Sequence, residues 1–171
     1  MLLTKILHYI TLTSVRYNID DSHSTLHAMN TLYHSINILR EEIPNKPYLK
    51  DQERIICTCA LLHDMIDRKY VNPEIAMLRL RSHFRTNFQP EEINTIEKIM
   101  TTMSYSKVKE YGYPRLGDYQ TAYHIVREAD LLGSYDFDRS MVYKIRRFND
   151  TFEHSYLESS QFFHHRVFRL I

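Results

Sequence analysis

Helical periodicity is the feature that most limits how this chain can fold. Apolar residues recur at intervals of three and four along most of its length, which is the spacing of one face of an α-helix. These stripes are Leu26, Met29, Tyr33 and Ile36; Ile55, Cys59 and Leu62; Ile93, Ile96, Met100 and Met103; and Ala122, Val126 and Ala129. No alternating pattern of useful length favours a β-strand. The periodicity therefore predicts an all-α fold, a compact helical bundle.

Helix breakers and helix starts agree with this pattern. The chain has only three glycines and five prolines, and every proline falls between the periodic segments. Asn72, Gln89 and Asp118 precede helical stretches and offer N-caps, the first two directly before a proline. The signals predict helices at residues 3–16, 24–41, 51–66, 73–84, 90–103, 118–132 and 138–149, and one more from about Glu158.

Length and charge narrow the possible partners. A chain of 171 residues is long enough to bury the core of one domain, and its formal net charge of +1 gives no global field for attracting a polyanion. The basic runs RLRSHFR at 79–85 and KIRR at 144–147 are no more basic than an ordinary solvated helix face. Nucleic acid is therefore disfavoured as a partner, and a steep loss of oligonucleotide binding with salt would be its sign.

The N-terminal stretch and the cysteines indicate a cytoplasmic location. Lys5, His8 and Arg16 interrupt the apolar start of the chain, which lacks the pattern of a signal peptide or a membrane span. Cys57 and Cys59 lie two positions apart, so that a helix sends them to different faces and a disulfide between them is disfavoured. We expect small core residues in a reducing compartment, and no membrane partner.

The segment CTCALLHDMID at 57–67 carries the first sign of chemistry. An apolar helix ends with His63 and Asp64 side by side, and a buried charge without a partner is costly. Asp67 follows one helical turn after His63, which gathers acid, imidazole and acid near one surface. A His-Asp pair alone is common by chance in a chain with 10 histidines, so further residues are needed to give it meaning.

Two other segments offer partners for this pair. His23, His27, Asn30 and His34 are spaced by four, three and four and predict an imidazole-rich helix face opposite the Leu26 stripe, although a merely solvated face is the alternative. Asp130 is embedded between Ala129 and Leu131, where an acid needs an ionic partner. A metal is one such partner, and pairing with Arg127 or exposure to solvent are the others.

Taken in order, the set of His27, His63-Asp64 and Asp130 resembles the HD superfamily of metal-dependent phosphohydrolases. The surrounding segments SHSTLH, ALLHDMIDRKY, IEKIMTTMSYSK and IVREADLLGSYDFDR are similar to small stand-alone HD hydrolases, including nucleotide pyrophosphohydrolases. The resemblance covers about residues 20–148. It implies a single HD domain over residues 1–171, with a core of about 20–148 and a helical appendage at about 150–171.

The resemblance also implies a metal site and a reaction. His27, His63, Asp64 and Asp130 would hold one divalent transition metal, Mn²⁺, Fe²⁺, Co²⁺ or Ni²⁺, with Mg²⁺ possible. A metal-bound hydroxide would attack phosphorus in a small phosphorylated substrate, with a nucleotide pyrophosphohydrolase or nucleotidase favoured over a cyclic-nucleotide phosphodiesterase. His83 and His124 are available for a second metal, but His124 lies about 120° around its helix from Asp130, so one metal is expected.

Five further residues receive roles at this site. His23 and Asp67 are catalytic candidates, as a proton or hydrogen-bond donor and as the group that orients the attacking water. Arg68, Lys69 and Lys107 are candidates for binding phosphate, although single cations are usually solvated. The competing interpretations are a hydrogen bond from His23 to the nearby loop and pairing of Asp67 with Arg68 or Lys69.

The chain also departs from the HD pattern. Ser24, Asn30 and Thr31 stand where this branch often has Asp, Arg and Val, and Glu128 replaces the first Asp of its Asp-Ala-Asp form. These departures favour a second hypothesis, a non-catalytic protein that binds metal or nucleotide for regulation. Turnover by the metal-loaded protein separates the two hypotheses.

Overall fold

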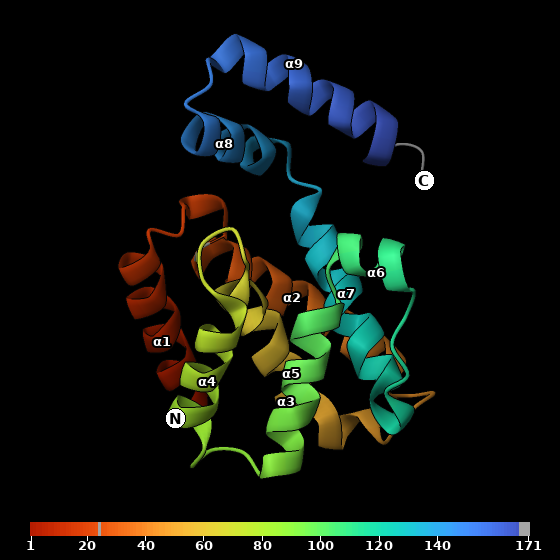
Figure 1. The fold of residues 1–171 in the computed structure, drawn as a ribbon. Coiled ribbons are helices and arrows are strands. Elements are labelled where there is room, and N and C mark those ends of the chain that lie inside the picture. Colours follow the sequence, from red (N-terminus) through yellow and green to blue (C-terminus); the bar gives the residue numbers. More distant parts are fainter. Residues whose placement is uncertain (24, 168–171) are drawn as a thin grey trace.

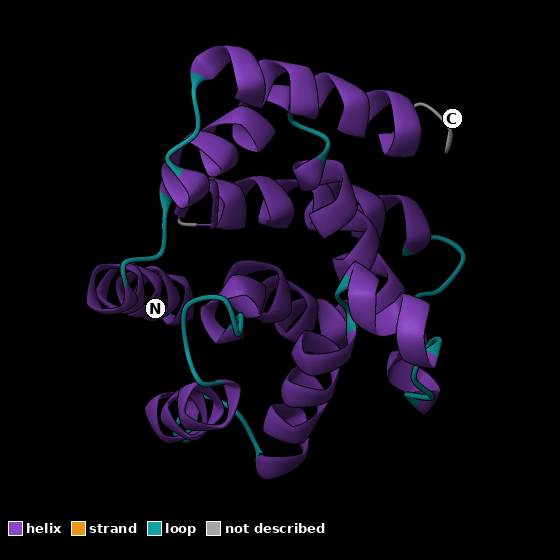
Figure 2. Cartoon of the chain, turned by 45° about the horizontal axis from the view of Figure 1, so that its top comes forward, coloured by secondary structure: helices purple, strands orange, loops and turns teal. Residues whose placement is uncertain are grey.

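The computed structural model describes residues 1–23 and 25–167, and all regular structure in that part of the chain is helical (Figures 1 and 2). Ser24 and residues 168–171 of the expected appendage lie outside the described residues. The α-helices are α1 (Leu2–Tyr17), α2 (Thr25–Glu42), α3 (Leu49–Leu62), α4 (Pro73–Phe84), α5 (Pro90–Thr102), α6 (Tyr105–Tyr111), α7 (Gln120–Ser134), α8 (Phe137–Phe148) and α9 (Phe152–Phe162). Shorter turns are η1 (Asp21–His23), η2 (His63–Ile66), η3 (Gly117–Tyr119) and η4 (Phe163–Val167). The predicted all-α class is confirmed.

Capping explains where the helices begin. The Asn72 side chain accepts hydrogen bonds from the backbone of Glu74 and Ile75 at 3.0 and 3.1 Å, and the Glu92 carboxylate accepts one from Gln89 N at 2.8 Å. Both predicted starts are confirmed. The predicted cap at Asp118 is wrong, because Asp118 lies in η3 and α7 begins after it without a side-chain cap.

The structure differs from the predicted helices at the start of α9 and at α6. α9 begins at Phe152 rather than near Glu158, because the Thr151 hydroxyl accepts a hydrogen bond from His154 N at 3.2 Å and starts the helix earlier. α6 was missed. It has only seven residues and buries none of them, so its periodic pattern is too short to stand out. Its ends are marked by the Ser104 cap and by Gly112 with φ of 74°.

α2, α3 and α7 form the centre of the bundle, with α1, α4 and α5 packed around them (Figure 1). The stripes predicted for α3, α5 and α7 are buried as expected. The largest fully buried side chains include Tyr123, Phe84, Ile10, Leu39, Leu49, Ile56 and Leu62. Residues 1–17 belong to this core as well, since Ile6 and Ile10 of α1 are buried in it.

The stripe predicted for α2 is wrong. Leu26, Met29 and Tyr33 are exposed, with 70%, 39% and 63% of their surface accessible, and Ile36 is only partly buried. The expected imidazole-rich face is not formed either, because His27 lies on the buried face while Asn30 is exposed. The face that α2 buries consists of His27, Ala28, Thr31, Leu32, Ser35 and Leu39.

Close packing accounts for this orientation. α2 contacts both α3 and α7, and small side chains such as Ala28, Thr31 and Ser35 let the helix axes approach where Met or Tyr would not fit. Apolar periodicity alone cannot detect such a face, because Thr31 and Ser35 count as polar. The buried face of α2 is therefore selected by side-chain size.

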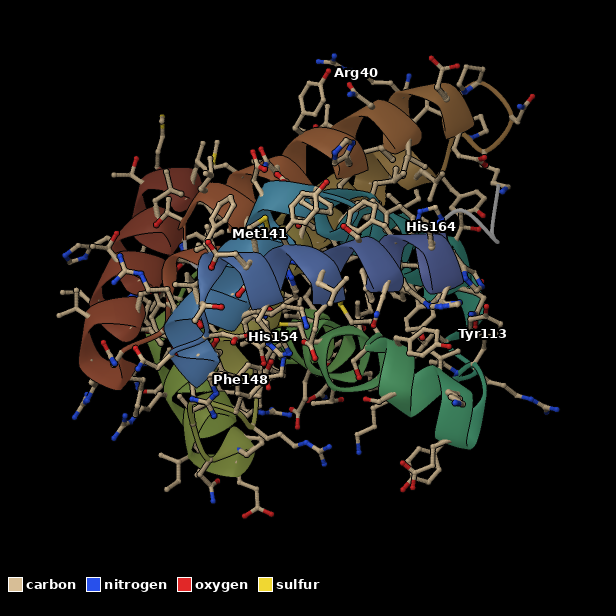
Figure 3. The ribbon with its side chains drawn as sticks, turned by 90° about the horizontal axis from the view of Figure 1, so that it is seen from above. Arg40, Tyr113, Met141, Phe148, His154 and His164 are labelled. Carbon is tan, nitrogen blue, oxygen red and sulfur yellow. The ribbon has the colours of Figure 1, made fainter. Side chains whose placement is uncertain are left out.

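α8 and α9 pack on each other beyond the end of α7 (Figure 1). The Lys144 ammonium is ion-paired with the Glu158 carboxylate, and the hydroxyls of Ser140 and Ser159 lie 3.0 Å apart. Seen from above, α9 crosses the molecule, with His154 near its start (Figure 3). α8 also contacts η1, so this pair of helices is joined to the rest of the fold beside η1.

In the part of the chain that the structure describes, no helix combines the length and apolar character that a membrane crossing requires.

The reversed orientation of α2 predicts a contrast in stability between two of its leucines. Leu32→Ala removes a side chain that is 8% exposed and should lower the free energy of unfolding by about 2–4 kcal/mol. Leu26→Ala, at an exposed position, should change it by less than about 0.5 kcal/mol. Urea unfolding of both variants measures the difference. A larger loss from Leu26→Ala would contradict the orientation.

Both cysteines should be slow to react in the folded protein. Burial, with a smaller effect of Glu53, raises the pKa of the half-buried Cys57 thiol to about 11, and burial raises the pKa of Cys59 further. Because the thiolate is the reactive form, labelling by iodoacetamide should be slow at pH 8 and rise about tenfold per pH unit up to pH 10. Cys57→Ser should abolish this labelling, whereas denatured protein should label at both positions. Fast labelling at pH 8 would contradict the burial of Cys57.

Candidate functional site

The four residues predicted to bind a metal come together where α2, α3 and α7 meet. His27 lies in the first turn of α2, and Asp130 lies one turn before the end of α7. His63 directly follows α3, and with Asp64 it forms the start of the η2 turn. Two helices, α2 and α7, and the η2 turn that follows α3 thus supply the four side chains.

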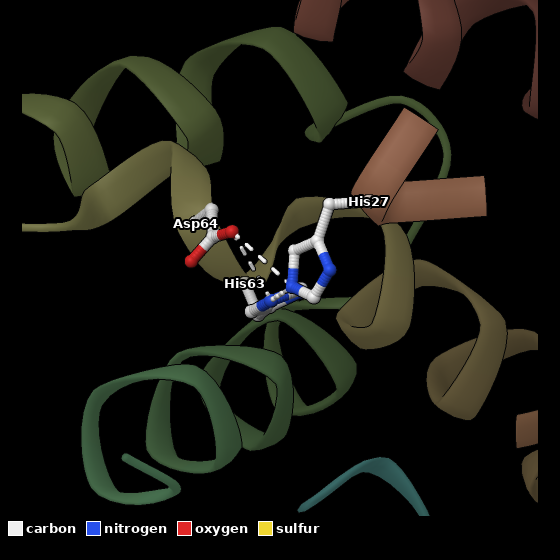
Figure 4. Close-up of side chains that lie close together, drawn as sticks. All are labelled: His27, His63 and Asp64. Atoms are coloured by element: carbon white, nitrogen blue, oxygen red, sulfur yellow. Dashed lines mark hydrogen bonds and ion pairs between the residues drawn. The ribbon is translucent and has the colours of Figure 1, made fainter. Parts of the chain in front are cut away.

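Their polar atoms lie at contact distances. The Nε2 atoms of His27 and His63 are 3.2 Å apart, and they lie 3.2 and 3.3 Å from Asp130 Oδ1. The same two nitrogens lie 3.5 and 3.4 Å from Asp64 Oδ2 (Figure 4). Two imidazole nitrogens therefore face each other with a carboxylate oxygen of each aspartate beside them.

Hydrogen bonding fixes which nitrogen of His63 faces this cluster. Its Nδ1 donates to the carbonyl oxygen of Ala60 at 2.9 Å, so in the neutral ring Nε2 carries the lone pair. Asp64 Oδ2 is buried and accepts no hydrogen bond from a described residue, and His27 Nδ1 is likewise buried without a partner there. The two imidazole nitrogens, at 3.5 and 3.4 Å, are thus the groups of the described residues that face Asp64 Oδ2.

Burial and the neighbouring charges shift the pKa values of the residues in the cluster. Burial alone would lower the pKa of His63, but the charges of Asp64 and Asp130 outweigh it and hold the pKa well above its usual range. Burial would raise the pKa of both carboxyl groups, whereas the His63 charge keeps them low. Burial lowers the pKa of His27 despite both acids. Without a metal, a proton on His63 balances part of the negative charge, and a metal taking this place must displace it.

His27, His63 and Asp64 fit a divalent transition metal, because their ligand atoms all lie within 4.8 Å of one another. Asp130 is not part of that group, although its Oδ1 lies 3.2 and 3.3 Å from the two imidazole nitrogens. Imidazole nitrogen and carboxylate oxygen together suit borderline ions such as Mn²⁺, Fe²⁺, Co²⁺ and Ni²⁺, which do not require a thiolate ligand. With metal–ligand distances of about 2.1 Å, neighbouring ligand atoms lie about 3.0 Å apart at octahedral and about 3.4 Å at tetrahedral angles. The 3.2–3.5 Å separations found here match this range closely. A cation would also supply the partner that Asp64 Oδ2 lacks.

His23 stands beside the cluster in a network of its own. Its Nδ1 lies 2.7 Å from the Ser22 hydroxyl, 3.2 Å from the Tyr70 hydroxyl and 3.4 Å from Asp20 Oδ1. The Asp20 carboxylate also accepts hydrogen bonds from both hydroxyls. With Nδ1 engaged, Nε2 is the nitrogen available to a ligand. Burial lowers the pKa of His23, so the ring is neutral near pH 7.

Asp67 connects this network to the metal cluster. Ligand atoms of His23, Asp64 and Asp67 lie within 4.8 Å of one another, so Asp64 belongs to two groups that could hold a cation. Asp67 also accepts a hydrogen bond from Lys69 N at 2.9 Å, and its Oδ2 lies 3.5 Å from the Lys69 ammonium. The pairing with Lys69 that the sequence left open is therefore present, together with the placement beside the cluster.

The site opens into a pocket of about 380 Å³. Its lining includes His23, Asp64, Asp67, Lys69, Asp130, Arg139, Tyr143 and Lys144. Of the three predicted phosphate-binding residues, only Lys69 is among the lining. Arg68 is exposed elsewhere, and the Lys107 ammonium lies over the Tyr111 ring at 5.3 Å.

Sequence reasoning missed Arg139 and Lys144, which α8 contributes to the pocket. One signal was available for Arg139. It occupies the first turn of α8, after the Asp136 cap, where a positive charge opposes the helix dipole. A cation at that position calls for a partner outside the helix.

Partners outside the cluster engage the other residues considered in the sequence, Arg127, His124 and His83. Arg127 donates to Glu128 at 2.6 Å rather than to Asp130, whose side chain is 23% exposed. His124 hydrogen-bonds with Gln120 at 3.1 Å and His83 packs between aromatic rings, and neither belongs to a group of described residues that could hold a metal.

Gly133 provides a test of the space behind His27. A Cβ at this position would lie 3.4 Å from both His27 Cε1 and Thr31 Oγ1, so alanine fits but a branched side chain would push the ring. Gly133→Val should weaken Co²⁺ binding at least about tenfold in calorimetry, whereas Gly133→Ala should stay within about threefold. Leu132→Val, at the exposed neighbouring position, controls for valine in a helix. Equal affinity of Gly133→Val and wild type would show that His27 is not a ligand.

Comparisons of this chain with protein-family models, with curated proteins and with solved structures find no match. The resemblance to the HD superfamily therefore stays a prediction, and the function has to be inferred from the geometry of the site.

Proposed function

We propose that this protein is a metal-dependent phosphohydrolase of the HD type that acts on a small phosphorylated substrate such as a nucleotide. The observation that carries the proposal is the convergence of His27, His63, Asp64 and Asp130. In five of the six residue pairs, nitrogen and oxygen atoms lie 3.2–3.5 Å apart. Asp64 and Asp130 also line a pocket.

A divalent metal held by these residues would lower the pKa of a bound water and polarise a phosphoryl oxygen. The protein's own part is to hold the ligand atoms in place. The Ala60 carbonyl orients His63 through Nδ1, and packing of α2 against α7 positions His27. Such preorganisation is what a hydrolytic metal site requires.

His23 and Asp67 are placed to handle protons. His23 is neutral near pH 7, and because the Ser22 and Tyr70 hydroxyls both donate to Asp20, its Nδ1 carries the proton and its Nε2 can accept one in the pocket. Asp67 can orient a water near Asp64, since ligand atoms of both acids lie within 4.8 Å of His23.

The pocket favours a small substrate. Its volume of about 380 Å³ is near the lower end of the roughly 300–1,000 Å³ typical of small-molecule sites. Lys69, Arg139 and Lys144 offset the acids of the lining, which makes an anionic substrate acceptable. A phosphorylated metabolite of nucleotide size meets both conditions, and a polynucleotide does not.

A binding protein with the same metal site is the second candidate. The ion pair of Lys69 with Asp67, at 3.5 Å, occupies two residues that catalysis would use, and supports this alternative. Both candidates predict metal binding, and only the first predicts turnover.

Metal analysis combined with a nucleotide panel tests the proposal. Wild-type protein should bind about one equivalent of Mn²⁺ or Co²⁺ and release phosphate or pyrophosphate from at least one substrate. His63→Ala and Asp64→Ala should lose the metal and lower kcat/KM at least about a thousandfold, because each removes both a ligand and its charge.

His154→Ala is the matched control, since His154 also belongs to a His/Asp/Glu group but lies exposed on α9. It should retain metal and activity. Metal binding without turnover on any substrate would favour the binding protein, and a protein that takes up no metal would exclude both candidates.

A further inference from the structure

Arg139 is fixed at the edge of the candidate site by two hydrogen bonds. Its Nε donates to the Ser22 carbonyl oxygen at 2.5 Å, and its Nη1 donates to the Ser134 hydroxyl at 3.3 Å. The Ser134 hydroxyl in turn lies 3.5 Å from Asp130 Oδ1. The guanidinium therefore bridges η1, which carries His23, and the end of α7, which carries Asp130.

Most donors of this guanidinium remain available. Among the described residues, neither Nη2 nor the second hydrogen of Nη1 has a hydrogen-bond partner, and Arg139 forms no ion pair. A partly buried arginine with a planar pair of open donors is suited to a bidentate anion.

The other cations of the pocket are engaged by acids. Lys69 lies 3.5 Å from Asp67, and Lys144 is ion-paired with Glu158. Arg139 is thus the pocket cation that lacks an acidic partner in the described part of the chain. A ligand with its own negative charge would complete its coordination.

We infer that Arg139 is the phosphate-binding residue of this site and binds a phosphate dianion through the open donors on Nη1 and Nη2 of its guanidinium. This inference rests on the proposed function, because the same phosphate would contact the metal held by Asp130 and its neighbours. The hydrogen bonds to Ser22 and Ser134 hold the guanidinium in one orientation before the ligand arrives. The ligand class is a phosphate monoester or the inorganic phosphate released from it.

Binding of inorganic phosphate to the metal-loaded protein tests this inference directly. In calorimetry, Arg139→Gln should weaken phosphate binding by about 10- to 100-fold, which corresponds to the loss of charged hydrogen bonds. Arg139→Lys should be intermediate, because lysine keeps the charge but not the planar pair of donors. Metal content and the thermal midpoint are measured on each variant, and Arg139→Lys decides the outcome if the Gln variant does not fold.

Kinetics and rescue separate binding from structure. With the best nucleoside monophosphate of the panel, Arg139→Ala should lose about 100-fold in kcat/KM, and added guanidinium chloride at low millimolar concentration should restore part of it. A structural role alone would not respond to guanidinium. Arg40→Gln on α2, at an exposed position that does not line the pocket, is the control and should behave as wild type.

The outcomes distinguish this inference from the proposed function. If wild type binds phosphate through Arg139 but hydrolyses nothing, the inference stands and the hydrolase fails. If Arg139→Gln binds phosphate as wild type does, or if wild type binds neither inorganic phosphate nor a nucleoside monophosphate, the inference is overturned even where hydrolysis is observed. A monoester that binds while free phosphate does not, with loss in Arg139→Gln, assigns the site to the intact substrate.

Discussion

The close approach of α2 and α7 is the constraint on which the site depends. Gly133 faces His27 and Thr31 so closely that even a Cβ would touch both. Only this separation brings His27 Nε2 within 3.2 Å of both His63 and Asp130, which belong to two other elements. The small residues where α2 meets α7 therefore determine both the helix packing and the geometry of the site. A wider helix spacing would move His27 Nε2 away from His63 and Asp130.

The electrostatics of the cluster follow from this geometry. Two carboxylates and two imidazoles in a buried place are unfavourable unless a positive charge lies among them. In the protein alone, His63 takes that role as an imidazolium. The fold thus tolerates the cluster by protonation, and the same arrangement offers a cation a binding place at the cost of one proton. Stability and ligand binding are coupled through a single ring.

Much of the fold could be predicted from periodicity, and the errors have specific physical causes. Helix starts at Asn72 and Gln89 were found because proline and a cap make a strong local signal. α2 was misoriented because its buried face uses Thr31 and Ser35, whose value lies in their size. α6 was missed because a helix of seven residues gives too short a periodic pattern to detect.

The residues of the candidate site were also only partly predictable from the sequence. His27, His63, Asp64 and Asp130 could be proposed from residue type and order, and the structure brings them together. Arg139 could not be assigned, since its relation to Ser22 spans 117 positions and exists only after folding. Sequence patterns identify which residues can act as metal ligands. Contacts between distant parts of the chain decide which of the many Lys and Arg side chains lies beside those residues.

The arrangement of α7 and α8 has a consequence for how such a protein can diversify. The metal cluster lies on the central helices, whereas Arg139, Tyr143 and Lys144 lie on α8, which only residues 135–136 connect to α7. If the cluster holds a metal as proposed, substitutions on α8 can alter which anion the pocket accepts while the ligand residues beside the central helices stay unchanged. Metal binding and substrate choice would then be separable traits, and selection could change one of them without first relaxing the other.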